Sequence, residues 1–361
     1  MTIRRRYIVI AVVLVVALAA IWLLFFRRPP TFTAVTWSGP YGRAQASALF
    51  IPYQQRSGID VHFAQYDGGL AELRRRVTTK SYGWDAIDFE LPDAVAACDE
   101  GLLETIDPAS LQDPGDFVPG ALGRCWVGSV VYSQAIAYAP GRFGAARPNA
   151  LADFFDTAKF PGPRALRSTD PKFNLELALL ADGVAPRDIY KVLSRPEGVA
   201  RALAKLGTLG PIVWWTSSSE PAAMLADGRA AFATILNGDI YEAATHKNDL
   251  GVIWDHQLYE LDVFAVPKGD PKRAMAMDFI RFATSAEPLA HVADWVPYGP
   301  SRRSALALVT KNPELGTPMR RFLPTAPENF RNAFAVDDGW WRTHRAQMTA
   351  SWQAWQSLRN R

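Results

Sequence analysis

The stretch GWDAIDFELPDA, residues 83–94, places Asp88 and Glu90 where a buried strand should carry apolar side chains. A second close pair, Glu260 and Asp262, occurs in LYELDVFAVP, and its two side chains point the same way because side chains alternate along a strand. Two acids on one face repel each other unless a cation joins them. Carboxylates bind ammonium groups through charge-assisted hydrogen bonds about twice as strong as neutral ones, so the pattern predicts a site for an organic cation. A structural role, with Asp88 as an internal salt-bridge partner, is the alternative.

Two other uses of paired acids are less well supported. A glycoside hydrolase uses two carboxylates as acid and nucleophile, but a chain with 36 acidic residues contains some such pair by chance. The sequence has no G-x-S-x-G, H-E-x-x-H or P-loop motif, and its five histidines are scattered. It also lacks the D-x-D-x-D-G calcium loop. We therefore expect a binding protein without catalytic residues, metal or cofactor.

Aromatic side chains complete the expected site, because the methylene chain between charged groups packs on rings and ring faces attract cations. Trp214 and Trp215 point to opposite faces of a strand, so at most one of them lines a cleft. Asn237 begins an N-G-D turn that either approaches a ligand or is an ordinary turn. The candidate ligand-binding residues are Trp37, Asp88, Glu90, Asp170, Trp215, Asn237, Tyr241, Tyr259, Glu260, Asp262 and Tyr298.

The net charge of +3 belongs to the N-terminus. Arginines 4–6 and 27–28 flank an uncharged run from Tyr7 to Phe26, and without this segment 34 basic residues face 36 acidic ones. Twenty apolar residues as a helix span roughly 30 Å, the thickness of a bilayer core. Residues 1–30 therefore predict a signal anchor that tethers an exported protein to the inner membrane, with a cleaved signal peptide as the alternative. A nucleic-acid partner is not expected.

Cys98 and Cys125 are the two cysteines of the chain, 27 positions apart, with no histidine near enough for a zinc pattern. In an exported protein this arrangement favours one disulfide bond. Two buried free thiols are the alternative.

The remaining chain alternates strand and helix patterns, which predicts β-α-β units and a mostly parallel sheet. Expected strands include TFTAVTW, IDVHFAQYDG and WDAIDF, with helices between them. The long apolar segment SVVYSQAIAYAP leaves this first part near residue 138, and VIWDHQLYELDVFAVPKG, interpreted as a returning strand pair, re-enters it near residue 262. Two crossings imply two lobes, a hinge and a cleft. The expected lobes are 31–138 with 262–305, and 139–261, followed by a C-terminal helical segment, 306–361, that packs on both.

Several segments together resemble the periplasmic solute-binding proteins of ABC importers (extracellular solute-binding protein family 1), in particular the spermidine/putrescine-binding type. They are VTWSGPYGRAQ, LFIPYQQRSGIDV, WDAIDFE, LYELDVFAVPKGDPKRAMAMDFIRFATS and VPYGPS, and the resemblance covers about residues 31–330. It implies a two-lobed α/β fold of the type II kind. It also implies a monomeric protein, periplasmic or otherwise extracytoplasmic, that closes on a ligand and delivers it to a permease and its ATPase.

The resemblance also implies positions. A ligand-binding aspartate falls on Asp262, a second carboxylate on Asp170, and two aromatic residues on Trp37 and Tyr298. The chain departs from the pattern where Glu260 replaces a tryptophan, Phe173 replaces an acid and Glu90 replaces a hydroxyl residue. These departures make spermidine itself doubtful but keep a polyamine-like cation as the expected ligand, with an amino-acid derivative, an anion or a sensor role as alternatives.

Overall fold

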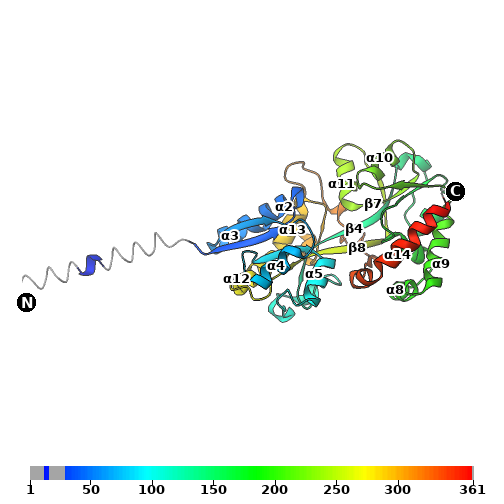
Figure 1. The fold of residues 1–361 in the computed structure, drawn as a ribbon. Coiled ribbons are helices and arrows are strands. Elements are labelled where there is room, and N and C mark those ends of the chain that lie inside the picture. The colour runs from blue at the N-terminus through cyan, green and yellow to red at the C-terminus, as the bar shows by residue number, and fades with distance from the viewer. Residues whose placement is uncertain (1–11, 16–28, 360–361) are drawn as a thin grey trace, which may run out of the picture.

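The computed structural model describes residues 12–15 and 29–359. The expected N-terminal anchor lies almost wholly outside the described residues, so that prediction is not tested. Within the described part, no helix is long and apolar enough to cross a membrane. From Thr31 onward the chain forms a mixed α/β fold, with the first strands at one end of the molecule and the C-terminal helix at the other (Figure 1).

The first part follows the predicted β-α-β pattern. Strands β1 (Thr31–Thr36), β2 (Asp60–Gln65) and β3 (Ala86–Glu90) are parallel, with β1 in the middle. Between β1 and β2 one continuous helical stretch contains α2 (Gly39–Gln45), a π-helical segment, η1 (Ala46–Phe50), and α3 (Ile51–Ser57). It ends at Gly58, whose left-handed backbone (φ 69°) is favourable for glycine. Helices α4 (Ala71–Thr79) and α5 (Leu91–Asp99) follow β2 and β3.

Two long strands join this part to the rest. They are β4 (Val127–Tyr138) and β8 (Gly251–Ala265), which run antiparallel to each other. The prediction of a strand pair at 252–269 is wrong, because β8 is a single strand of 15 residues in which the bend at His256 (φ 56°) is absorbed without a reversal. Strand β8 pairs with β3 at one end and β4 pairs with β7 at the other. The sheet therefore continues through both halves in the order β2-β1-β3-β8-β4-β7-β5-β6.

The second part contains β5 (Arg164–Arg167), β6 (Ile212–Trp215) and β7 (Phe232–Leu236), with β5 parallel to both neighbours. Its helices are α6 (Leu151–Phe155), α7 (Asn174–Ala181), α8 (Ile189–Leu193), α9 (Pro196–Gly207), α10 (Glu220–Ala226) and α11 (Asn237–Thr245). The chain then returns through β8 to α12 (Arg273–Ala283), α13 (Ala286–Trp295) and the short strand β9 (Gly299–Pro300). After β10 (Phe334–Ala335), helix α14 (Asp338–Arg359) packs against α5 and α9. The segment between β9 and β10 is mostly irregular rather than helical.

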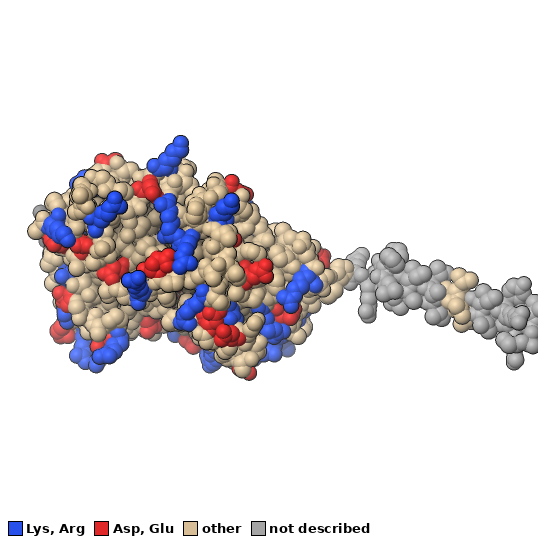
Figure 2. Space-filling view, turned by 180° about the vertical axis from the view of Figure 1, so that it is seen from behind, with Lys and Arg blue, Asp and Glu red and all other residues tan. Residues whose placement is uncertain are grey.

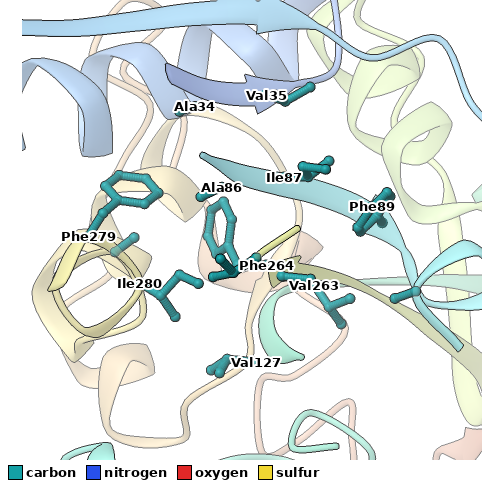
Figure 3. Packing of buried hydrophobic residues seen from close by; sticks show 14 of the residues in the cluster. Ala34, Val35, Ala86, Ile87, Phe89, Val127, Val263, Phe264, Phe279 and Ile280 are labelled. Carbon is teal, nitrogen blue, oxygen red and sulfur yellow. The ribbon is translucent and has the colours of Figure 1, made fainter. Parts of the chain in front are cut away.

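The buried side chains form separate cores. One core contains residues from 32–131 and 259–296, and includes the cluster around Ile87, Phe264 and Phe279 (Figure 3). Two others gather mainly residues of 135–258. We call the parts around them lobe 1 (31–131 with 259–296) and lobe 2 (135–258). The predicted disulfide between Cys98 and Cys125 is present in lobe 1, with the Cα atoms 5.9 Å apart.

The surface carries both signs of charge. On the face in Figure 2, acidic side chains lie among lysine and arginine side chains rather than apart from them. Many pair directly, as in Arg74 with Glu100 and Arg320 with Glu328. Such mixing lacks the concentrated positive potential of a nucleic-acid surface.

Candidate functional site

A cleft of about 690 Å³ opens between the two lobes. Lobe 1 contributes the loop after β1, the end of β3 and the end of α13, and lobe 2 contributes the start of α11, while β4 and β8 lie at the floor. This placement follows from the sheet, because ligands of α/β proteins bind beyond the carboxyl ends of the strands. The lining residues are Trp37, Ser38, Pro40, Tyr41, Glu90, Tyr132, Leu236, Gly238, Asp239, Tyr241, Glu242, Thr245, His246, Asp262, Trp295, Val296, Pro297, Tyr298 and Leu315.

The titratable side chains of this lining are mostly acidic. Among the described residues around the cleft, four carboxylates (Glu90, Asp239, Glu242 and Asp262) have no lysine or arginine side chain beside them in the lining. His246 is the only histidine among the described lining residues. A cleft with this lining attracts cations and disfavours anions that bring no positive group of their own.

Glu90 and Asp262 face the cleft together. They are register partners in the antiparallel pairing of β3 with β8, so their side chains lie on the same face of the sheet. Glu90 is the last residue of β3 and is exposed to the cleft, whereas Asp262 lies inside β8 and is only 6% exposed. Together the two carboxylates form a pair of hydrogen-bond acceptors at the floor of the cleft.

Asp262 lacks a hydrogen-bond donor. Its Oδ1 atom is buried and has no partner. Burial raises the pKa of Asp262 well above its usual range, and the negative charges of Asp88, Glu90 and Glu260 raise it further. Partial desolvation also raises the pKa of Glu90, a rise that Lys172 opposes. The cleft thus holds a carboxylate whose ionised form needs a cation.

Asp88 lies behind this floor rather than in it. Its side chain is fully buried and accepts hydrogen bonds from Gln45 Nε2 (2.9 Å) and Ser129 Oγ (3.0 Å). Tyr41, which lines the cleft, joins the same network: its hydroxyl lies 2.8 Å from Ser129 Oγ and accepts from Gln45 Nε2 at 2.9 Å. Burial raises the pKa of Asp88 to about 7. Asp88 therefore holds the aromatic wall in position and does not line the cleft itself.

Aromatic rings form the walls. Tyr41 and Tyr298 meet edge to face with ring centroids 5.3 Å apart, and Tyr298 also contacts Tyr132, at 6.4 Å. Trp37 packs edge to face on Tyr66 at 4.8 Å, and its buried Nε1 has no hydrogen-bond partner. Rings held by one another keep their faces available for the methylene groups or the cation of a ligand.

Helix α11 forms the wall from lobe 2. Its N-terminus faces the cleft through Gly238 and Asp239, and no side chain caps it. The first-turn N–H groups of a helix have no acceptor within the helix and carry partial positive charge. Burial raises the pKa of Asp239 to about 7, with a further contribution from Glu242, so Asp239 is partly protonated at neutral pH. This wall can donate hydrogen bonds although its side chains are acidic.

Asn237 positions that wall. Its side chain is fully buried, accepts the Ser133 N–H at 2.8 Å and donates to the Pro297 carbonyl, which ties α11 to β4 and to the loop that carries Tyr298. The turn predicted at this point is the first turn of a helix. Asn237 holds lining residues in place without lining the cleft.

Glu260 lies two residues before Asp262 on β8 and does not line the cleft. It forms a short ion pair with Lys172 Nζ, which also lies 2.8 Å from Asp338 Oδ1. All three side chains are nearly buried. Glu260 points to the same face as Asp262, as the alternation predicts, but it has its own cation.

Three further sequence candidates lie away from the cleft. Asp170 pairs with Arg345 of α14 at 2.6 Å. Trp215 is buried in a core of lobe 2, and the Tyr259 hydroxyl donates to the Pro119 carbonyl at 3.2 Å. Five candidates do line the cleft: Trp37, Glu90, Tyr241, Asp262 and Tyr298.

Sequence reasoning missed other lining residues, chiefly Tyr41, Tyr132, Glu242 and Trp295, and considered Asp239 only as the end of the N-G-D turn. Tyr41 was detectable, because it belongs to the same glycine and proline loop as Trp37 after a predicted strand. Asp239 and Glu242 follow the strand that ends at Leu236 and are spaced for one helix face, which is a weaker signal. Among the described residues, no group of His, Cys, Asp and Glu side chains is arranged to hold a metal ion.

Comparisons with known proteins agree on the family. A model of the family described as bacterial extracellular solute-binding protein matches residues 48–317. The chain is 38% identical over 326 residues to a gamma-aminobutyric acid-binding protein of Pseudomonas aeruginosa, covering 90% of each chain. Among solved structures, the Atu4243-GABA receptor has a TM-score of 0.71 and 29% identity, covering 91% of this chain and 98% of that one. The PBP MotA of A. tumefaciens B6 in complex with glucopine has a TM-score of 0.66 and 28% identity, with 91% and 99% covered.

Proposed function

Because this chain belongs to the bacterial extracellular solute-binding protein family and is the substrate-binding component of an ABC transporter, we propose that its cleft captures a small solute by a protonated amine. The family consists of non-enzymatic transport components that work outside the cytoplasm and deliver small solutes to a permease. One observation carries the proposal: the buried Oδ1 atom of Asp262, beside Glu90, has no hydrogen-bond donor.

The amine satisfies this carboxylate pair. A buried carboxylate without a partner costs free energy, which the protein avoids by raising the pKa, and an ammonium group replaces the missing proton with a charge-assisted hydrogen bond. Glu90 supplies a second acceptor on the same face. The rings of Trp37, Tyr41 and Tyr298 then surround the methylene groups next to the amine.

The opposite wall suits a carboxylate. The uncapped N-terminus of α11 offers backbone N–H groups to an anionic oxygen, and Asp239 in its protonated form donates one more hydrogen bond. A solute with an ammonium group at one end and a carboxylate at the other therefore finds a partner for each charge. We propose a short ω-amino acid of the γ-aminobutyrate type as the ligand. The names of the 38% and 29% identical proteins, a GABA-binding protein and a GABA receptor, support this class.

A solute held in this way joins the lobes, since Glu90 and Asp262 lie on the side of lobe 1 and α11 belongs to lobe 2. A ligand that contacts both lobes stabilises the closed arrangement by its extra contacts there. We propose hinge closure about β4 and β8, where the chain passes between the lobes at 131–135 and 258–259, a few residues from the expected crossings near 138 and 262. A polyamine remains the second candidate, because it shares the amine that the acid pair recognises.

A four-carbon ligand series tests the proposal. Isothermal titration of the purified protein with γ-aminobutyrate, n-butylamine, butyrate and putrescine varies one end group at a time on a common chain. We expect γ-aminobutyrate to bind most tightly and butyrate least tightly, because butyrate leaves Asp262 without a cation. Butyrate binding as tightly as γ-aminobutyrate would refute amine recognition. Putrescine binding more tightly than γ-aminobutyrate would refute the ω-amino acid and favour the polyamine.

A further inference from the structure

Lys172 is an ammonium group that the protein buries beside its own ligand-binding acids. It lies between β5 and α7 in lobe 2, is 6% exposed, and contacts Glu260 of β8 and Asp338 at the start of α14. Burial alone would lower the pKa of Lys172, but the two carboxylates raise it above its usual value, so the side chain is charged. Three elements far apart in the sequence therefore meet at one cation.

The cluster of Lys172, Glu260 and Asp338 adjoins the two carboxylates of the cleft floor. We call Glu90, Asp262 and Glu260 the acid row. Glu260 and Asp262 are two residues apart on β8 and share a face, and Asp262 faces Glu90. Tyr132, the register partner of Glu260, lines the cleft, so the cluster lies directly beside the floor. The charge of Lys172 also lowers the pKa of Glu90, against the rise caused by burial. The row thus has two positions for a cation, and Lys172 occupies one of them.

We propose that Lys172 is a specificity-determining residue: its ammonium group fills the second cation position of the acid row and restricts the cleft to solutes with one ammonium group. The inference rests on the proposed recognition of an amine by Glu90 and Asp262. It adds that Lys172 limits which amines the cleft can bind. Diamines and polyamines are rejected because their second ammonium group finds Glu260 and Asp338 already neutralised.

The chemistry of the cluster supports replacement of Lys172 by a ligand. A lysine side chain beyond Cβ is a propylammonium ion, so its truncation leaves a space of that shape with two carboxylates at its end. Asp338 Oδ2 is buried without a partner even in the presence of Lys172, so the position has unused acceptor capacity. A diamine bound at Asp262 by one end places its other ammonium group in this space.

Two variants with the same truncation test the proposal. Lys172→Ala leaves both carboxylates free, whereas Lys172→Ala/Glu260→Gln/Asp338→Asn leaves the same space without charge. Titration with γ-aminobutyrate, putrescine and cadaverine gives the ratio of diamine to amino-acid affinity for each protein. We expect Lys172→Ala to raise this ratio at least tenfold over the wild type and the triple variant to leave it near the wild-type value. An unchanged ratio in Lys172→Ala, or an equal rise in both variants, would overturn the proposal.

A second readout separates this inference from the proposed function. We expect propylammonium chloride to raise the thermal unfolding midpoint of Lys172→Ala, because it replaces the lost side chain, but to leave the wild type and the triple variant nearly unchanged. If the wild type binds no amine while this rescue occurs, amine recognition at Asp262 fails and the cation position at Glu260 stands. If the wild type binds γ-aminobutyrate and neither rescue nor a changed ratio occurs, the role of Lys172 fails alone. Should Lys172→Ala not fold because two buried carboxylates lose their cation, Lys172→Ala/Asp338→Asn keeps the truncation and leaves one carboxylate, Glu260, at the end of the space. An unchanged affinity ratio in this folded variant would equally refute the proposal.

Discussion

Asp262 lies directly opposite Glu90 in the antiparallel pairing of β3 with β8, so two carboxylates share one face of the sheet where the lobes meet. Like charges placed opposite each other destabilise a sheet. The protein retains them at a position where the partnerless Oδ1 atom of Asp262 raises the cost further. Such a cost at a cleft is typical of a binding site prepared for its ligand.

Asp262→Asn should lower the affinity for the amine and raise the stability of the ligand-free protein. Removal of one partner of a buried charge pair costs about 2 to 5 kcal/mol of binding free energy. The same change removes a carboxyl group whose ionisation is disfavoured by burial and by Asp88, so the free energy of unfolding should increase. Titration calorimetry and urea unfolding measure the two effects. Asp249→Asn, at an exposed position outside the cleft, is the matched control, and unchanged affinity in Asp262→Asn would remove this residue from the site.

Ligand-free stability should fall as the pH rises from about 5 to about 7. Burial raises the pKa of both Asp88 and Asp239 to about 7, so in this range the folded protein binds more protons than the unfolded chain, whose carboxyl groups titrate near 4. Stability declines with pH wherever the native state holds more protons. Urea unfolding at pH 5 and pH 7 measures the change, and Asp88→Asn should reduce it. A ligand-free protein that is more stable at pH 7 than at pH 5 would contradict these raised pKa values.

Amine binding should release protons. An ammonium group favours the ionised form of Asp262, whose pKa is raised by burial and by neighbouring carboxylates, so binding expels a proton and the affinity increases with pH. Calorimetry in two buffers with different ionisation enthalpies gives the number of protons released. Asp262→Asn should release fewer than the wild type. Proton uptake on binding would argue against a carboxylate as the acceptor.

Loss of the disulfide should destabilise lobe 1 without changing the binding contacts. In the chain-entropy model, a bridge across 27 positions stabilises by about 3.5 kcal/mol. Neither Cys98 nor Cys125 lines the cleft. Cys98→Ala/Cys125→Ala should therefore lower the urea midpoint while titration below that midpoint gives an affinity close to the wild type. An affinity loss of tenfold in a folded variant would mean that the bridge also positions the site.

The elements were predictable where their signals are local. Strand patterns are read within about ten residues, and β1, β2 and β3 lie where the patterns place them. The single strand β8 was misread because a bend at His256 has no local sequence signal, and its continuity depends on pairing with β4 and β10. Long-range pairing decides such cases.

The sequence predicted cleft-lining residues where they directly follow a strand. It did not predict which acidic side chains are held in ion pairs elsewhere in the fold. The positions of Trp37 and Glu90 follow from the rule that loops after parallel strands form the cleft. The two acids of β8 were predicted to share a face, but Glu260 belongs to an ion cluster in which Lys172 lies 88 positions from Glu260 and 166 positions from Asp338. Similarly, Asp170 is held by Arg345, 175 positions away. Which acid remains free for a ligand is thus a property of tertiary packing.

Asn237 gives the last prediction, because its place directly before Gly238 and Asp239 of the cleft lining suggests a ligand contact whereas its hydrogen bonds are structural. The side-chain amide links α11 to β4 and to the Pro297 carbonyl, next to Tyr298. Asn237→Ala leaves the Ser133 N–H and the Pro297 carbonyl without these partners, at a cost of about 1 to 3 kcal/mol of stability for each buried group left unpaired. The α11 wall should loosen, so we expect weaker binding of γ-aminobutyrate together with lower stability.

The ligand series separates this role from direct contact. A positioning residue affects every ligand that uses α11, so Asn237→Ala should weaken γ-aminobutyrate more than n-butylamine, which has no carboxylate for the helix N-terminus. The matched control is Asn248→Ala, at a residue that lies outside the cleft lining and whose side-chain amide donates a long 3.5 Å hydrogen bond to the Ala222 carbonyl. Equal losses for both ligands in a protein of unchanged stability would instead place Asn237 at the amine.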